Sequence, residues 1–400
     1  MTAATLPLAG VRVLDLSRVL AGPICGMTLG DLGAEVIKVE HPERGDDTRD
    51  WGLRIGRTET AYFNSANRNK RSLTLDLKQP QAIELLLALA KQCDALVQNF
   101  KHGEAERLGF GYQQVKAVRP DIVYCSISGY DPHGPEAARP GYDIVVQGES
   151  GLMAINGEAG RPPLKVGVAI VDMVTGLYAA QAVLAALYQR QASGQGRHVE
   201  LALFDCGFMI SAYYGLEALL SDSDPQRYGN AHPSIVPYGV FDASDGPLVI
   251  AVGNNAQFVR FCRDVVDRPD IPQDPRFATN LARREHREQL LPMLRDEIGR
   301  RPRALLLQRL AAAEIPCGEV LGLLEALRSD RARLGGLVTQ QPHPLAGQVH
   351  VMSPPFRFDG ERSPVRHPPP GLGQHNADVL ADLLGLDAER IAALQRDRVI

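Results

Sequence analysis

Val11-Arg-Val-Leu-Asp-Leu16, Cys25-Gly-Met-Thr-Leu-Gly-Asp-Leu32 and Glu35-Val-Ile-Lys-Val-Glu40 follow one another near the start of the chain. The first and third stretches are rich in aliphatic and β-branched residues, which predicts strands over 11–16 and 35–40, and the second has helical spacing. The alternation continues, with helices predicted over 80–93 and 172–191 and strands over 95–98, 121–127 and 197–203. This order predicts an α/β fold with an open, mostly parallel, Rossmann-like sheet.

The chain changes character near residue 222, which predicts a second domain. Its 400 residues exceed what one hydrophobic core usually serves. Ser221-Asp-Ser-Asp-Pro225 resembles a linker, and a hairpin predicted over 238–251, turning at Asp245-Gly246, precedes helices rich in Arg and Glu. We therefore predict a large domain over 1–221, a smaller α+β domain over 222–328 and a C-terminal segment over 329–400.

Composition argues against several classes of protein. A net charge of −4 does not suit a general nucleic-acid binder, which is usually strongly basic. The six cysteines have neither CxxC nor metal-ligand spacing, which indicates reduced thiols in a cytoplasmic protein and predicts no metal site. We recognise no signal segment, and we expect no apolar run of the roughly 18 residues that a membrane span needs.

Asp172 is the only charged residue in Val166-Gly-Val-Ala-Ile-Val-Asp-Met-Val-Thr-Gly176, where a buried strand is expected to give way to a helix. An Asp at that point is either an N-cap, which accepts hydrogen bonds from free main-chain N–H groups, or a nucleophile. The two roles are compatible, because the start of a helix favours negative charge. Asp15 and Asn99 also fall near predicted strand ends, so we expect the three side chains to meet in one crevice.

The usual phosphate-binding loops are missing from this sequence. Arg18-Val-Leu-Ala-Gly-Pro23 follows the first strand in place of G-x-G-x-x-G, which argues against NAD or ATP. Basic clusters follow later strands instead, at 67–73 and 98–103, with Arg107 nearby. Each could be a solvated turn, but their recurrence favours an anion that carries a nucleotide, with Phe100 as an apolar surface beside it.

These motifs together resemble the family III CoA-transferases, the group that contains formyl-CoA and carnitine CoA-transferases. The resemblance spans nearly the whole chain and rests on segments 14–23, 32–40, 69–72 and 98–100, on Gly141-Tyr-Asp143, on Ser150-Gly-Leu-Met153 and on Asp172. Within the family the chain is most similar to the succinyl-CoA-dependent dicarboxylate branch, the glutarate-type enzymes. The segments that carry this second likeness are 44–49, 124–130, 231–238 and 253–258.

The resemblance implies that Asp172 is the catalytic nucleophile, passing CoA from an acyl-CoA to a carboxylic acid through an aspartyl anhydride and an enzyme–CoA thioester. An unperturbed Asp titrates near about 4, so we expect it to be ionised at neutral pH. CoA and acyl-CoA enter as substrates, with no tightly bound cofactor. The family further implies an interlocked homodimer, in which segment 329–400 returns to the CoA-binding domain over 1–221. Contacts with CoA are implied for Val19, Ala21, Arg71, Asn99, Phe100, Arg107 and Tyr142.

The acceptor acid in this branch is a short dicarboxylate such as glutarate or itaconate, and its second carboxylate needs a cation or several hydrogen-bond donors. His232, Ser234 and Tyr238, together with Arg54 or Arg68, are the candidates, and the first three lie in a segment that resembles the branch. The alternative for His232 is that it only braces the turn before Pro233.

The α-methylacyl-CoA racemases share the fold and form the alternative function. They have His at the position of Tyr142, whose phenol, with an ordinary pKa near about 10, is poorly suited to general-base catalysis at neutral pH. Two other positions depart from the transferase pattern, where some members have His for Arg18 and Arg for His41. The region 229–238 also lacks the glycine run that closes over the nucleophile in formyl-CoA transferase.

Overall fold

The computed structural model describes residues 6–56 and 59–400. Contacts divide the chain into two compact units. Unit 1 contains the chain up to Leu152 together with Lys165–Leu216 and Ser329–Ile400, and unit 2 contains Met153–Leu164 and Glu217–Arg328. The C-terminal segment therefore belongs to unit 1 by its contacts, although it follows unit 2 in the sequence.

Unit 1 is built on a six-stranded sheet in the order β3-β2-β1-β4-β5-β6, in which every neighbouring pair is parallel. The predicted α/β class and parallel sheet are thus confirmed. The strands are β1 (Arg12–Asp15), β2 (Glu35–Glu40), β3 (Lys70–Thr74), β4 (Ala95–Gln98), β5 (Val123–Ser128) and β6 (Arg197–Ala202). The order reverses between β1 and β4, and the carboxyl ends of strands at such a point are where open α/β sheets bind ligands.

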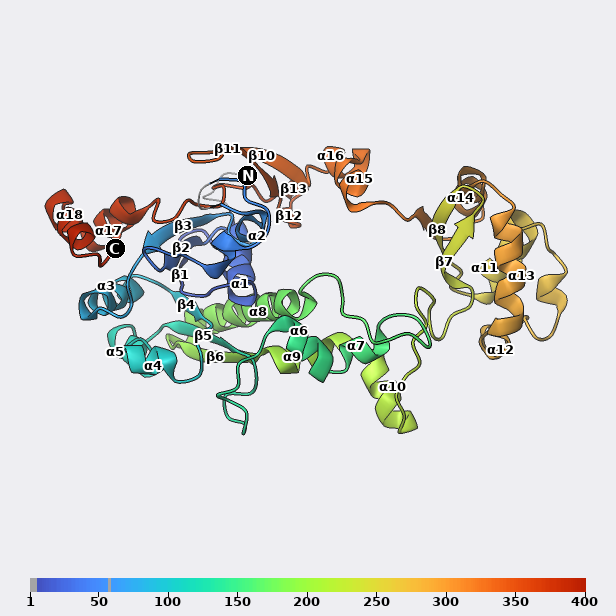
Figure 1. Cartoon of the computed structure of the whole chain (residues 1–400), viewed down its shortest axis with the longest axis horizontal. Coiled ribbons are helices and arrows are strands. Elements are labelled where there is room, and N and C mark those ends of the chain that lie inside the picture. Colours follow the sequence, from blue (N-terminus) through green and yellow to red (C-terminus); the bar gives the residue numbers. More distant parts are fainter. Residues whose placement is uncertain (1–5, 57–58) are drawn as a thin grey trace. The chain divides into compact units, whose positions relative to one another are not determined.

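Helices cover both faces of this sheet (Figure 1). One face packs α1 (Ala21–Asp31) and α8 (Ile170–Ser193), which also contact each other. The other face forms the main hydrophobic core with α3 (Pro80–Lys91), α4 (Glu104–Leu108), α5 (Tyr112–Val118), α17 (Asn376–Leu384) and α18 (Ala388–Arg396). The remaining unit 1 elements include α2 (Ala61–Ser65), α6 (Asp143–Glu149), α9 (Leu203–Ser211), α16 (Asp330–Leu334), β10 (Val338–His343), β11 (Gly347–Met352), β12 (Arg357–Phe358) and β13 (Glu361–Arg362).

Strand β3 was not predicted, because Asn67-Arg-Asn-Lys-Arg-Ser-Leu73 was interpreted as an exposed phosphate-binding cluster. Its cations are instead used inside unit 1: Lys70 Nζ donates to Asp15 Oδ2 at 2.8 Å, and Arg68 pairs with Asp31. Both cations are buried. The phosphate-binding interpretation is therefore wrong for Arg68 and Lys70, because tertiary packing supplies carboxylate partners that the local sequence does not reveal.

Helix α8 corrects two further expectations. No strand precedes it: residues 162–169 are irregular. Within the described part of the chain, α8 is also long enough and apolar enough to cross a membrane, judged by length and composition alone. The bent pair of α9 and α10 (Tyr213–Ser221) passes the same test when the two helices are counted together. The expectation that no such run exists is therefore wrong, but α8 passes the test as a core helix that packs against α1, α9, β5 and β6.

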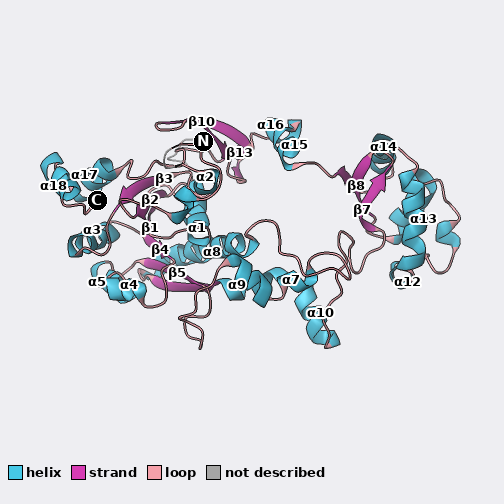
Figure 2. Cartoon of the chain, in the orientation of Figure 1, coloured by secondary structure: helices cyan, strands magenta, loops and turns pink. Residues whose placement is uncertain are grey.

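Unit 2 has its own hydrophobic core around a three-stranded antiparallel sheet (Figure 2). The predicted hairpin is present as β7 (Tyr238–Ala243) and β8 (Gly246–Ala251), but Ala243 pairs with Gly246, so it turns at Ser244-Asp245, one residue before the predicted Asp245-Gly246. Strand β9 (Cys317–Glu319) pairs with β8. Its helices are α11 (Asn255–Arg260), α12 (Asn280–Glu285), α13 (Arg287–Gly299), α14 (Arg303–Ala312) and α15 (Leu323–Arg328). Helix α7 (Leu152–Ile155) and helix α10 each span a boundary between the units.

Candidate active site

Asp172 is the third residue of α8, and it does not cap that helix. The side chain of Asp143 does so: its Oδ1 accepts from the main-chain N–H of Val171 at 2.8 Å and of Asp172 at 3.2 Å. The predicted helix start is thus confirmed, while the predicted capping role belongs to Asp143. The Asp172 carboxylate is therefore not needed to cap α8.

Asp143 is itself held in place from α6, of which it is the first residue. Gln147, one turn along α6, donates to Asp143 Oδ2 at 2.6 Å, and the Gln147 Oε1 accepts from Val166 N–H at 2.8 Å. These bonds tie α6 to the segment that leads into α8. The sequence contained a signal for this role, because Asp143 ends the Gly141-Tyr-Asp motif, but no function was assigned to it.

The environment of Asp172 changes its acidity. The residue is 9% exposed, and burial, followed by the negative charge of Asp143, raises the pKa of its carboxyl from an ordinary 3.8 to about 7. Asp172 was expected to be ionised at neutral pH, and a pKa of about 7 makes it only partly so. Removal from water makes the carboxylate costly and leaves a substantial protonated fraction near neutrality.

A close crossing of two helices places Asp172 beside the loop that follows β1. Gly176, one turn after Asp172, packs against the first turn of α1, where a Cβ at position 176 would lie 2.5 Å from the main-chain oxygen of Ala21 and 2.7 Å from Ile24 Cβ. Only glycine allows this approach without a shift of backbone. The start of α8 and the start of α1 therefore lie together.

A pocket of about 180 Å³ opens at this point, and we call it the Asp172 pocket. It brings together most of the residues for which a site role was predicted, although Tyr142 remains 61% exposed. These residues are Asp172, Val19, Ala21, Asn99, Phe100 and Tyr142. Arg18, Lys101, His102 and Arg139 add positive or ionisable side chains to its lining.

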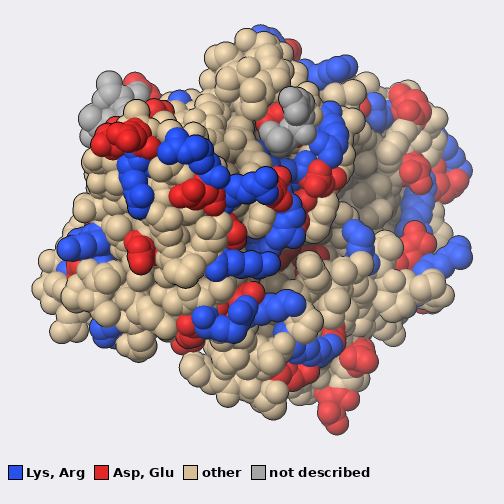
Figure 3. All heavy atoms as spheres, turned by 60° about the vertical axis from the view of Figure 1, so that its left-hand side comes forward, with Lys and Arg blue, Asp and Glu red and all other residues tan. Residues whose placement is uncertain are grey.

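A second pocket of about 260 Å³, the Arg107 pocket, shares Arg18, Asp47 and Phe100 with the first. Arg107, a predicted CoA contact, lines it together with the further cations Arg44 and Lys78. The shared residues mean that the two pockets adjoin. Lys and Arg side chains also gather across one face of the molecule, interspersed with Asp and Glu (Figure 3), so the negative net charge does not prevent local anion binding.

Two predicted positions lie elsewhere in unit 1. Arg71 is in β3 and pairs with Glu35 and Asp382, and it lines neither of these pockets. Asp15 was expected to meet Asn99 and Asp172 in one crevice, but it is fully buried against Lys70 and Ser17 beneath the loop. That expectation is wrong for Asp15, because its carboxylate points into the structure.

His232, Ser234 and Tyr238 lie together in unit 2. His232 Nδ1 accepts from the main-chain N–H of Ser234 at 3.0 Å and of Ile235 at 3.2 Å. The main-chain N–H of His232 donates to the Tyr238 carbonyl at 3.0 Å. The bracing role considered for His232 is therefore present. Burial, with the charge of Arg287, lowers the pKa of His232, so the imidazole stays neutral at physiological pH.

The fold and the pockets define an α/β protein with a buried carboxylate and several cationic side chains over the carboxyl ends of a parallel sheet. The model of the family described as "CoA-transferase family III" matches residues 8–376. The chain is 39% identical to the succinyl-CoA:glutarate CoA-transferase of Mus musculus, over 98% of this chain and 90% of that protein. It is 38% identical to the succinate–glutarate CoA-transferase of Agrobacterium fabrum, over 94% of this chain and 96% of that protein.

Solved structures agree with this result. A CAIB/BAIF family protein from Brucella suis superposes with a TM-score of 0.83 at 38% identity, covering 94% of this chain and 99% of that one. The chain therefore belongs to the family III CoA-transferases, and it is a CoA-transferase that uses CoA thioesters as substrates. The predicted family and enzyme class are confirmed.

Proposed function

We propose that this enzyme transfers CoA from succinyl-CoA to a short dicarboxylate, with glutarate as the first candidate and Asp172 as the nucleophile. The observation that carries the proposal is the position of the Asp172 carboxylate, which is relieved of capping by Asp143 and lines a pocket with Val19, Asn99 and Tyr142. The substrates named for the mouse and Agrobacterium relatives support the choice of donor and acceptor.

The proposed chemistry balances without an oxidant or a reductant. The Asp172 carboxylate attacks the thioester carbonyl, the C–S bond breaks, and a mixed anhydride and CoA thiolate result. The thiolate attacks the aspartyl carbonyl of the anhydride, which releases succinate and leaves an aspartyl–CoA thioester. The acceptor carboxylate attacks that thioester, which gives a second mixed anhydride and CoA thiolate. The thiolate then attacks the acceptor's acyl carbonyl in this anhydride, which forms the new acyl-CoA and releases the free Asp172 carboxylate.

Burial of Asp172 suits this role in two ways. A carboxylate with few water contacts needs little desolvation before it attacks, and a raised pKa makes it a better nucleophile than an exposed aspartate. A dry pocket also protects the anhydride and the thioester, because water would hydrolyse either of them.

The two adjoining pockets suggest how CoA lies. We infer that the pantetheine arm follows Val19, Ala21 and Asn99 to the Asp172 pocket, while the phosphates use the cations of the Arg107 pocket. Phe100, which lines both, would form the apolar surface where the two parts meet. We retain His232, Ser234 and Tyr238 as the proposed readers of the distal carboxylate of the acceptor.

We also propose that the enzyme is a homodimer in the cytoplasm. Unit 1 exposes large apolar side chains on neighbouring helices, Ile144 on α6, Leu177 on α8 and Met209 on α9 among them, and exposed apolar surface of this kind supports a protein interface. The six cysteines are free thiols, which supports a reducing compartment. Sedimentation of the purified chain tests the dimer, and a monomer at micromolar concentration would contradict it.

Trapping of the covalent intermediate tests the central proposal. The enzyme is incubated with succinyl-CoA and then treated with hydroxylamine or borohydride, and the Asp172 peptide is analysed by mass spectrometry. Modification of Asp172 is expected, and an Asp172→Asn variant should show neither modification nor turnover. Asp143→Asn serves as the matched control, because it keeps the nucleophile and should still be labelled. Transfer without any modification of Asp172 would disprove the covalent scheme.

A panel of acceptors assayed with succinyl-CoA as the donor tests substrate choice. Glutarate should be used with a higher kcat/KM than monocarboxylates of the same length, since only a diacid can occupy the distal site. His232→Ala should raise the KM for glutarate and leave the KM for succinyl-CoA less affected. Equal use of monocarboxylates would refute the dicarboxylate assignment.

A further inference from the structure

The loop between β1 and α1 forms one wall of the Asp172 pocket, through Arg18, Val19 and Leu20. Side chains from distant segments hold its backbone. The side-chain amide of Asn99 accepts from the main-chain N–H of Arg18 at 2.8 Å and donates to the Arg18 carbonyl at 2.8 Å. Tertiary contacts therefore position the loop, in addition to the local bond from Ser17 N–H to Asp15 Oδ1.

Val19 has an unusual conformation in this loop. Its φ is +69°, in the left-handed region that a β-branched residue rarely adopts. Such a conformation persists only where the surroundings enforce it. The contact at this point is the Val19 N–H, which donates to Asp46 Oδ1 at 3.2 Å.

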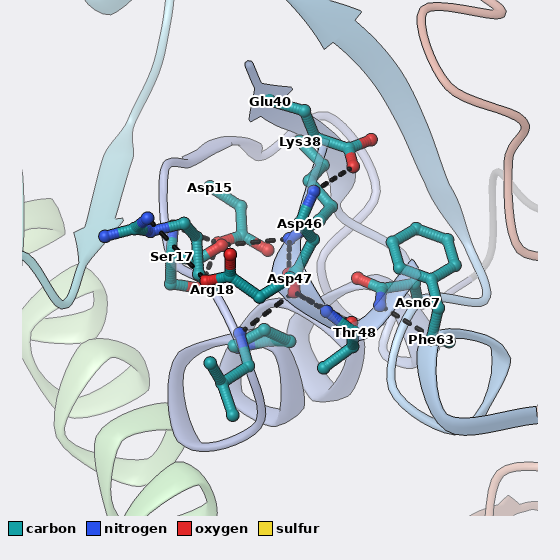
Figure 4. Close-up of polar contacts among 12 residues, drawn as sticks. Asp15, Ser17, Arg18, Lys38, Glu40, Asp46, Asp47, Thr48, Phe63 and Asn67 are labelled. Atoms are coloured by element: carbon teal, nitrogen blue, oxygen red, sulfur yellow. Dashed lines mark hydrogen bonds and ion pairs between the residues drawn. The ribbon is translucent and has the colours of Figure 1, made fainter. Parts of the chain in front are cut away.

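Asp46 is one half of a buried ion pair (Figure 4). Lys38 Nζ donates to Asp46 Oδ2 at 2.9 Å, and both side chains are 0% exposed. The same ammonium donates to the Ser17 carbonyl at 2.9 Å. Lys38 therefore holds the loop at Ser17, and Asp46 holds it two residues later at Val19.

The pair is charged in the folded protein. Burial opposes the charge on each group, but the attraction between them prevails, so that the pKa of Lys38 is raised and that of Asp46 is lowered. Thr48 orients the carboxylate further, donating to Asp46 Oδ1 from its N–H at 3.0 Å and from its hydroxyl at 2.7 Å. Burying two charges costs desolvation free energy, and a buried ion pair can in exchange fix a specific local geometry.

We propose that Lys38 and Asp46 are positioning residues for acyl-CoA: their ion pair holds Val19 in its left-handed conformation and thereby fixes the loop that the thioester passes on its way to Asp172. This inference rests on the proposed function, since it takes the Asp172 pocket as the acyl-CoA site. Neither residue lines the Asp172 pocket, whereas both line the Arg107 pocket. Their side chains are 0% exposed and bind each other and the loop, so their effect on the Asp172 pocket is transmitted through the backbone of residues 17–19.

The main test is Asp46→Asn in the full-length enzyme. The amide keeps the size of the side chain and an oxygen for the Val19 N–H, but it removes the charge opposite Lys38. The KM for succinyl-CoA and the Kd for free CoA, measured by calorimetry, should each rise about tenfold, while kcat changes less than about threefold. If Asp46→Asn does not fold, Thr48→Val offers a milder perturbation, which should raise the same two constants about threefold.

Two further variants separate positioning from stability. Asp31→Asn makes the same chemical change in the buried Asp31–Arg68 pair at the far end of α1, and it should lower stability without changing the KM for succinyl-CoA. Val19→Gly removes the conformational strain, so the combination of Val19→Gly with Asp46→Asn should lose less CoA affinity than the two single effects predict.

The outcomes are distinct. A raised Kd for CoA with Asp46→Asn, a normal one with Asp31→Asn and coupling to Val19→Gly support the inference. Equal effects of Asp46→Asn and Asp31→Asn, or strict additivity with Val19→Gly, overturn it. Because CoA binding is measured without turnover, these results stay interpretable even if Asp172→Asn proves active and the covalent scheme fails.

Discussion

Replacing Asp172 with asparagine should make the folded enzyme more stable while it abolishes turnover. The wild-type carboxylate is buried beside Asp143 with a pKa raised from 3.8 to about 7, so ionisation is much easier in the unfolded chain than in the folded one. Between these two pKa values the folded state binds more protons than the unfolded state, and stability therefore falls as pH rises. An amide never ionises and escapes this penalty.

The magnitude follows from the two pKa values. One pKa unit corresponds to 1.36 kcal/mol, so the difference of about 3 between them costs the wild type roughly 4 kcal/mol once Asp172 is ionised. The advantage of Asp172→Asn should be under about 1 kcal/mol at pH 4, about 2 kcal/mol at pH 5 and about 4 kcal/mol at pH 8. Relaxation and water entry on ionisation make the last figure an upper bound.

Urea unfolding at a series of pH values, at one fixed protein concentration, measures this difference directly. Asp359→Asn provides a control, since Asp359 is exposed and its positive φ suits asparagine equally well, and its stability should follow the wild type at every pH. A difference between Asp172→Asn and the wild type that does not depend on pH would refute the reasoning, because a lost contact or a packing effect has no cause to grow between pH 4 and pH 8.

Three further predictions concern the cap of α8, its crossing with α1 and a buried guanidinium in unit 2. Asp143→Asn keeps an acceptor for the cap of α8 but removes the charge that adds to burial in raising the pKa of Asp172, so the acid limb of kcat/KM should move to lower pH; an unchanged pH profile would contradict this. Gly176→Ala places a methyl group 2.5 Å from a main-chain oxygen of α1, and should lower the free energy of unfolding by about 1–3 kcal/mol and kcat/KM at least about tenfold. Denaturant titration and steady-state kinetics measure the two effects, and a variant with full activity would contradict the prediction. Arg283→Met in unit 2 leaves two carbonyls and an amide oxygen without their buried donor, and should cost about 2–5 kcal/mol in chemical denaturation, whereas a loss below about 1 kcal/mol would show that water replaces the guanidinium.

Much of the framework could be read from local pattern. The strands near residues 11–16, 35–40 and 95–98 were predictable because they are short stretches rich in aliphatic and β-branched residues, which a parallel sheet buries on both faces. The family motifs led to Asp172, and the structure places it in one pocket with Val19 and Asn99. Strand β3 was missed because Lys70 and Arg71 give an exposed pattern, and the carboxylate of a distant segment, Asp15, accounts for the burial of Lys70.

A parallel sheet, the family and the candidate nucleophile could all be predicted from residue types in a fixed order along the chain, although strand β3 could not. The environment of that nucleophile is a property of the folded chain. Tertiary structure assigned the helix cap to Asp143, raised the pKa of Asp172 by removing water, and used the Lys38–Asp46 pair to hold Val19. The physical reason is that burial and charge–charge interactions depend on distance in space, and segments far apart in the sequence supply the partners.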